Sequence, residues 1–109
     1  MKIYKRIKTL SINKAFQGRR FKTPEYKAYE EELLYALPMC LSFPSAPYSF
    51  SFKFGFSNKA SDLDNPVKLL VDIMQKKYGF NDKEIYHMTI EKKIVPKGEE
   101  YFSLEIKTL

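Results

Sequence analysis

Apolar and polar residues alternate most regularly between residues 48 and 57. Aromatic side chains occupy every second position, and small or polar residues stand between them: Tyr48, Phe50, Phe52, Phe54 and Phe56 against Ser49, Ser51, Lys53, Gly55 and Ser57. A period of two places successive side chains on opposite faces of a strand. We therefore predict a strand whose aromatic face packs into the core under helices, in preference to an exposed platform for stacking bases.

Two segments have the spacing of amphipathic helices, residues 23–37 and residues 65–77. Each starts with a polar capping residue followed by proline, Thr23-Pro24 and Asn65-Pro66, and Pro38 ends the first helix. The predicted buried stripes are Tyr26, Tyr29, Leu33 and Leu37 in the first helix, and Val67, Leu70, Val71 and Met74 in the second.

The rest of the chain predicts three more strands and two loops. The strands cover residues 2–9, 85–95 and 101–107, and the loops cover residues 11–22 and 39–47. We expect the first strand at a sheet edge and the last two joined at Pro96-Lys97-Gly98 as a hairpin. The order β-α-β-α-β-β predicts one α+β domain over residues 1–109, a small mixed or antiparallel sheet packed by two helices.

Composition narrows the classes of function. With 109 residues and 44% apolar residues, the chain has material for one core. It has no apolar run of membrane-spanning length and no secretory signal, so we expect a cytoplasmic protein with no membrane partner. One cysteine, Cys40, and one histidine exclude an internal disulfide and a Cys/His zinc site, so a bound metal needs oxygen ligands.

The charge of the chain is uneven. The net charge is +6, and residues 1–27 contain nine Lys or Arg residues against the single acid Glu25. A cationic surface of this kind attracts polyanions such as nucleic acid. Our candidates for contacts with DNA phosphates are Lys14, Arg19, Arg20 and Lys22; the alternative is a solvated loop.

Three aspartates are the candidate chemical site. Asp62 and Asp64 are two residues apart after the aromatic strand, so extended geometry would point both carboxylates to the same side. If the next strand is a neighbour, the helical crossover would bring Asp82 to the same end of the sheet. Three clustered carboxylates repel one another unless a divalent cation compensates them, which favours Mg²⁺ or Mn²⁺ and hydrolysis of a DNA backbone.

A basic residue accompanies the acids. Lys68 would stand in the first turn of the second helix, where its ammonium can stabilise an oxyanion or orient a water. Asp72, four residues later on the same face, would pair with Lys68 and hold it in place. The alternative is ordinary helix capping, because Asp64 and Asn65 are both good capping residues.

The motif Asp62-x-Asp64-Asn65-x-x-Lys68-x-x-x-Asp72, followed by Asp82 and Ile85, resembles the signature of RusA-type Holliday junction resolvases, which are common in bacterial genomes and prophages. The resemblance covers residues 57–95 best. It implies Asp62, Asp64 and Asp82 as catalytic metal ligands, Lys68 as the essential basic residue, and a homodimer. The position of Ile85 favours Asp82 as the third acid, with Glu84 as the alternative.

The resemblance extends loosely to the N-terminal half, where Asn13 matches an Asn-containing turn and becomes a candidate DNA contact. It implies Mg²⁺-dependent resolution of four-way DNA by paired cutting in recombination and repair, for which a twofold dimer supplies two sites. Two alternatives stay open: a non-catalytic nucleic-acid-binding domain, and a nuclease for flaps, forks or single strands.

Overall fold

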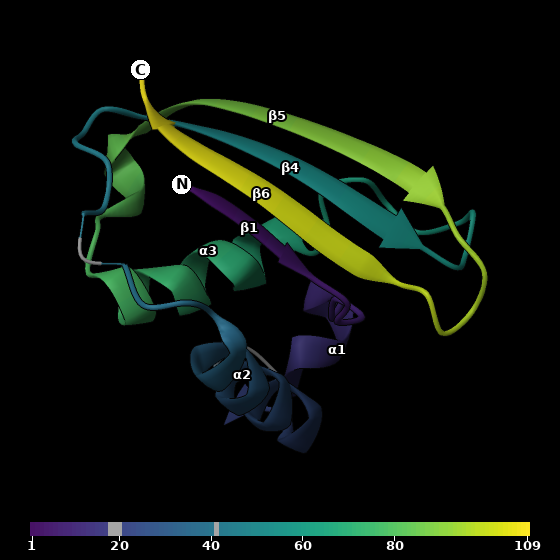
Figure 1. The fold of residues 1–109 in the computed structure, drawn as a ribbon. Coiled ribbons are helices and arrows are strands. Elements are labelled where there is room, and N and C mark those ends of the chain that lie inside the picture. The colour runs from purple at the N-terminus through teal and green to yellow at the C-terminus, as the bar shows by residue number, and fades with distance from the viewer. Residues whose placement is uncertain (18–20, 41) are drawn as a thin grey trace.

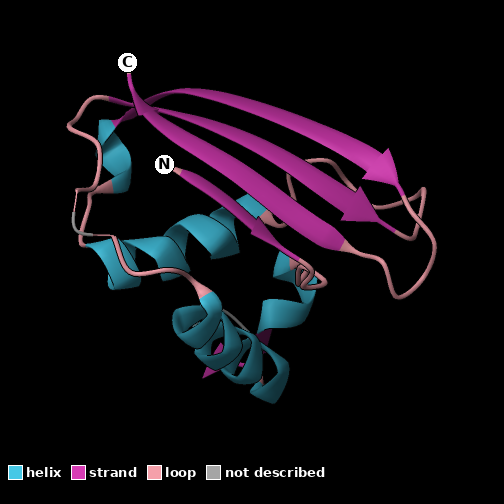
Figure 2. Cartoon of the chain, in the orientation of Figure 1, coloured by secondary structure: helices cyan, strands magenta, loops and turns pink. Residues whose placement is uncertain are grey.

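The computed structural model describes every residue of the chain except 18–20 and 41. Its main feature is a four-stranded mixed sheet in the order β1-β6-β4-β5, with α1, α2 and α3 on one side of it (Figure 1, Figure 2). The elements are β1 (Lys2–Lys5), α1 (Ile12–Ala15), β2 (Phe16–Gln17), β3 (Phe21–Lys22), α2 (Pro24–Ala36), β4 (Tyr48–Phe56), α3 (Val67–Tyr78), the 3₁₀ turn η1 (Asp82–Glu84), β5 (Ile85–Ile94) and β6 (Tyr101–Thr108). The predicted α+β class and the order of its main elements are confirmed.

The aromatic face of β4 forms the centre of the core. All five of its alternating aromatic residues are buried, and their rings contact one another along the strand, as Phe52 and Phe54 do with centroids 5.6 Å apart. This face packs toward α3, which lies between the sheet and α2 in Figure 2. Because α3 has neighbours on two sides, it also buries Leu69 and Ile73, outside the predicted stripe.

The start and end of α2 follow the sequence prediction. Thr23 is extended, and its hydroxyl accepts a hydrogen bond from the Tyr26 backbone N–H at 3.2 Å, while Pro24 opens the helix. The helix ends at Ala36, because Leu37 precedes Pro38 and takes the extended conformation that a following proline favours. The four residues of the predicted stripe are buried.

The start of α3 corrects the prediction of an Asn65-Pro66 cap. The helix begins at Val67, Pro66 stands at the capping position, and no side chain caps the first turn. The reason is local: residues 63–66 form turns in which the backbone N–H of Val67 bonds the carbonyl of Asp64. At its other end α3 stops at Gly79, whose φ of 76° suits glycine.

The predicted hairpin of the last two strands is wrong. β4 lies between them, parallel to β5 and antiparallel to β6, and β6 continues the sheet to the edge strand β1. This order gives the buried β4 a hydrogen-bonding partner on each of its two edges. The segment between β5 and β6, residues 95–100, passes the end of β4, where the Val95 N–H bonds the Phe56 carbonyl.

The N-terminal third contains more secondary structure than predicted. The first strand is shorter than residues 2–9 but does lie at the sheet edge. Residues 11–22, expected to be a loop, contain α1 and the short antiparallel pair β2–β3, because the Thr23 hydroxyl and N–H tie this segment to the carbonyls of Lys14 and Ala15. Of the helices in the described part of the chain, none has the length and apolar character needed to span a membrane.

Candidate functional site

A groove of about 510 Å³ runs between α3 and β5. Its apolar lining comes from α3 and β5. Its polar lining consists of two of the candidate acids, the candidate base and two side chains of β5. The apolar residues are Val67, Val71, Ile85, Met88 and Ile90, and the polar ones are Asp64, Lys68, Asp82, Tyr86 and His87.

Three segments supply the charged residues of this groove. Asp64 comes from the turn before α3, Lys68 from the first turn of α3, and Asp82 from the start of η1. The Gln75 side chain fixes Asp82, because its Oε1 accepts a hydrogen bond from the Asp82 backbone N–H at 3.0 Å. Residues separated by eighteen positions therefore face one space.

The route by which Asp82 reaches the groove differs from the prediction. β4 and β5 are neighbours, as expected, but they are parallel (Figure 1). Tyr48 at the start of β4 pairs with Ile85 at the start of β5. Asp82 therefore lies near the beginning of β4, whereas the residues directly after Phe56 lie at the other end of that strand, and the chain has returned to the groove by Asp64. The crossover helix must run back along the sheet before a parallel strand can begin.

Lys68 contacts two acids, of which Asp82 lines the groove and Asp72 lies outside the lining. Its ammonium nitrogen Nζ lies 3.1 Å from Oδ1 of Asp72, one helical turn along, and 3.7 Å from Oδ2 of Asp82. The expected pairing of Lys68 with Asp72 is therefore present. The hydrogen bond to Asp72, with the charges of both acids, raises the pKa of Lys68 above its ordinary value. The side chain thus carries a positive charge at neutral pH while remaining 58% exposed.

Asp62 has a different position from Asp64. It is exposed and is absent from the groove lining, and its backbone carbonyl accepts a hydrogen bond from the Asn65 N–H at 3.4 Å. The prediction that extended geometry points both carboxylates one way fails, because β4 ends at Phe56 and residues 63–66 form turns. Asn65 is partly exposed beside this turn, and Glu84, the alternative third acid, lies in η1 outside the groove lining.

The acids of the groove fit a hard divalent cation in type. No set of three or more His, Cys, Asp or Glu side chains among the described residues is arranged to hold a metal ion. Mg²⁺, however, commonly uses only one or two protein carboxylates and completes its shell with water and phosphate oxygens. Asp64 and Asp82 are the two candidate ligands that line one space, and Lys68 is the cation beside Asp82 in this structure.

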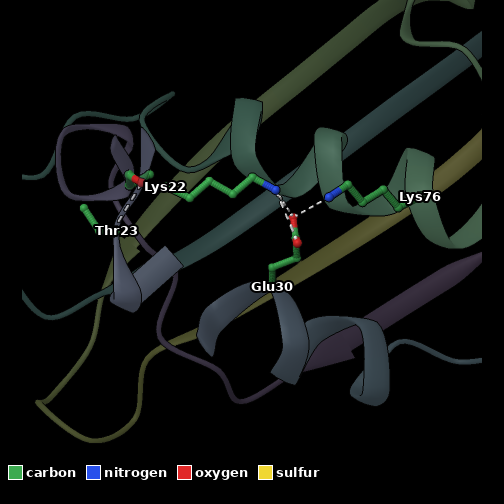
Figure 3. Close-up of polar contacts among 5 residues, drawn as sticks. Lys22, Thr23, Glu30 and Lys76 are labelled. Atoms are coloured by element: carbon green, nitrogen blue, oxygen red, sulfur yellow. Dashed lines mark hydrogen bonds and ion pairs between the residues drawn. The ribbon is translucent and has the colours of Figure 1, made fainter. Parts of the chain in front are cut away.

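A second charged cluster lies where the N-terminal segment meets α2 and α3 (Figure 3). The Glu30 carboxylate receives the ammonium groups of Lys22 at 3.1 Å and Lys76 at 2.9 Å, and Lys22 also lies 5.1 Å from the Tyr26 ring centroid. Burial tends to raise the pKa of Glu30, but the hydrogen bonds from Lys76 and Lys22 outweigh it and leave that pKa lowered. Glu30 and Lys76 belong to no motif, so the sequence offered no signal for this cluster.

The candidate DNA contacts are distributed around this N-terminal segment. Lys14 is exposed at the end of α1, whereas Lys22 is engaged by Glu30. Arg19 and Arg20 lie outside the described residues, as does the side chain of Asn13.

Comparison with known proteins adds no family assignment. No protein-family model matches this chain, and a search of curated proteins found no match. The motif of residues 62–72 and the groove are therefore the features from which a function can be inferred.

Proposed function

We propose that this protein is a Mg²⁺-dependent endodeoxyribonuclease that resolves four-way DNA junctions, acting in the cytoplasm in recombination and repair. The observation that carries the proposal is that Asp64, Lys68 and Asp82, from three segments of the chain, line one groove. The resemblance of residues 57–95 to RusA-type resolvases supports the same reaction.

Ordinary helix capping accounts poorly for these acids. The first turn of α3 has no side-chain cap, so neither Asp64 nor Asn65 performs the structural role that competed with metal binding. The aromatic face of β4 cannot serve as a platform for stacking bases, because it is buried. A binding domain without catalysis would have to use another part of the molecule.

The charged residues of the groove have proposed roles. Asp64 and Asp82 would hold Mg²⁺, with Asp62 able to contribute from the adjacent turn, and Mn²⁺ would serve as a substitute. The bound ion would supply activation of a water and compensation of charge on the phosphodiester. Lys68, protonated at neutral pH, presents its ammonium to a phosphate oxygen, and Asp72 positions that ammonium.

Branched DNA accounts for the remaining features of the proposal. A four-way junction has two equivalent strands to cut, so a twofold homodimer would supply the second groove. The net charge of +6 favours binding to the phosphate backbone, with Lys14, Arg19, Arg20, Lys22 and Asn13 as proposed contacts. Selectivity would then come from the shape of the junction, since phosphate contacts do not read bases.

The decisive test is cleavage of synthetic DNA by the purified protein. With Mg²⁺ we expect symmetric cuts in a four-way junction, and slower cutting of a fork, a flap and a linear duplex at the same salt concentration. Asp64→Asn should abolish cutting while preserving junction binding, because it removes a groove carboxylate and leaves the fold unchanged. Asp62→Asn is the matched control and should lose less activity, since Asp62 lies outside the groove lining.

Two results would refute the proposal. One is the absence of cutting with both Mg²⁺ and Mn²⁺, which would make a non-catalytic nucleic-acid-binding domain the better description. The other is unchanged cutting by Asp64→Asn, which would show that this groove is not the active site. A preference for fork, flap or single-stranded DNA over the junction would keep the chemistry and change the substrate.

A further inference from the structure

One tyrosine of the groove is placed there by an irregularity of β5. Ile85 pairs with Tyr48, but the next residue of β4, Ser49, pairs with His87, so β5 contains one extra residue at Tyr86. Ile85 and Met88 both pack against the core although they are three residues apart, a spacing that regular alternation does not allow. The bulge lets both face inward and leaves Tyr86 at the groove.

The bulge also separates the directions of two neighbouring side chains. His87 Nδ1 lies 3.0 Å from the Ser49 hydroxyl of the adjacent strand. Tyr86 is instead 67% exposed, and in the described part of the chain its ring and hydroxyl have no ring contact or hydrogen bond. Bulges of this kind at sheet edges often redirect a side chain toward a functional site.

Most other tyrosines of the chain are committed to packing. Five make ring contacts, namely Tyr4, Tyr26, Tyr48, Tyr78 and Tyr101, and Tyr29 is buried. Tyr35 resembles Tyr86 in having no ring contact, but it stands 92% exposed on α2 and does not line the groove. Tyr86 is therefore the exposed tyrosine that shares a groove with the Lys68–Asp82 pair.

We propose that Tyr86 stacks on an unpaired nucleobase of the DNA strand that enters this groove. The inference rests on the proposed function and names the part of the substrate that the groove recognises. A free aromatic ring offers a flat surface that any base can stack on, and Val71, Ile85 and Met88 provide an apolar environment beside it. Lys68, in the same groove, offers the positive charge that the adjoining phosphate requires.

The test measures binding without cutting, with the full-length protein and Ca²⁺ in place of Mg²⁺. The probes are a single-stranded oligonucleotide, a four-way junction and a linear duplex of the same sequence. The single strand and the junction each carry 2-aminopurine, which in the junction stands at the branch. Tyr86→Ser should weaken binding to the first two about ten-fold or more and remove the stacking-dependent quenching of 2-aminopurine fluorescence. Duplex binding should stay within about two-fold, because paired bases are not available to the ring.

Two variants control the experiment. Tyr86→Phe keeps the aromatic face and should bind like the parent protein. Tyr35→Ser removes an equally free tyrosine elsewhere and should also bind like the parent protein. A loss of single-strand and junction binding specific to Tyr86→Ser supports stacking; unchanged binding, an equal loss for duplex, or an equal loss in Tyr35→Ser overturns it.

Cleavage of the junction by the parent protein with Mg²⁺ is assayed separately, so the two proposals can fail independently. If the parent protein does not cut but Tyr86→Ser still loses binding to unpaired DNA, stacking stands and the nuclease fails. If the parent protein cuts and Tyr86→Ser binds normally, the nuclease stands and stacking fails.

Discussion

The two charged clusters on α3 differ in the sign of the central charge and in its exposure to solvent. Near the start of the helix the Lys68 ammonium lies beside two carboxylates, whereas near its end the Glu30 carboxylate lies between the ammonium groups of Lys22 and Lys76. Lys68 is 58% exposed in a groove, while the Glu30 side chain is 16% exposed and joins β3, α2 and α3. The exposed cluster is accessible to a ligand, and the enclosed one connects parts of the fold.

The largest expected difference between the clusters is in catalysis. Lys68→Gln should lower the rate constant for junction cleavage about 100-fold or more, because the ammonium that faces the phosphate is lost. Lys76→Gln, eight residues along the same helix, is the matched control and should cut at close to the parent rate. The measurement is single-turnover cleavage with saturating protein, and equal rates for Lys68→Gln and the parent protein would remove Lys68 from the reaction.

At Glu30 we expect a smaller effect, and one on stability in place of catalysis. Glu30→Gln should lower the free energy of unfolding by about 1 kcal/mol, because two partly exposed lysines lose their common partner. Glu31→Gln on the same helix is the control, since Glu31 is exposed, and should change stability by less than about 0.5 kcal/mol. Urea denaturation measures both values, and equal stabilities of the two variants would show that the Glu30 cluster contributes little.

The smallest effect is a pH dependence of the stability that the Glu30 cluster contributes. The pKa of Glu30 is lowered in the folded protein from an ordinary value of 4.5, so its contribution is complete above that pH. The contribution is lost as the pH falls below about 4.5 and the folded carboxylate takes up a proton. We expect the stability difference between the parent protein and Glu30→Gln to shrink between about pH 5 and pH 3; a constant difference would contradict the ionic origin.

Local patterns predicted the parts of the fold that neighbouring residues determine. The alternation of residues 48–57 identified both the strand and its buried face, because side-chain direction in a strand follows from position alone. Thr23-Pro24 identified the start of α2, because capping involves groups within one turn. The same reasoning failed at Asn65-Pro66, where the preceding turns supply the backbone hydrogen bonds.

Two of the errors concern partners distant in the sequence. Pro96-Lys97-Gly98 favours a turn, yet a turn does not specify whether the strands it joins are neighbours, and β4 lies between them. The end of the sheet at which Asp82 lies was predicted wrongly for the same reason, because it depends on whether β5 runs parallel or antiparallel to β4, although Asp82 does line one groove with Asp64. The clustering of Glu30 with Lys22 and Lys76 likewise depends on how α2 packs against α3.

By itself the sequence determined the α+β class, the buried strand, the two main helices and the spacing of Lys68 and Asp72 along one helical face. These features follow from periodicity and from contacts within one turn, which short stretches of chain encode. The tertiary structure alone decided the strand order, the meeting of Asp64, Lys68 and Asp82 in one groove, and the bulge that exposes Tyr86. Such features arise because the core must satisfy the backbone of β4 on both edges and bury Ile85 and Met88 together, which are requirements of the whole fold.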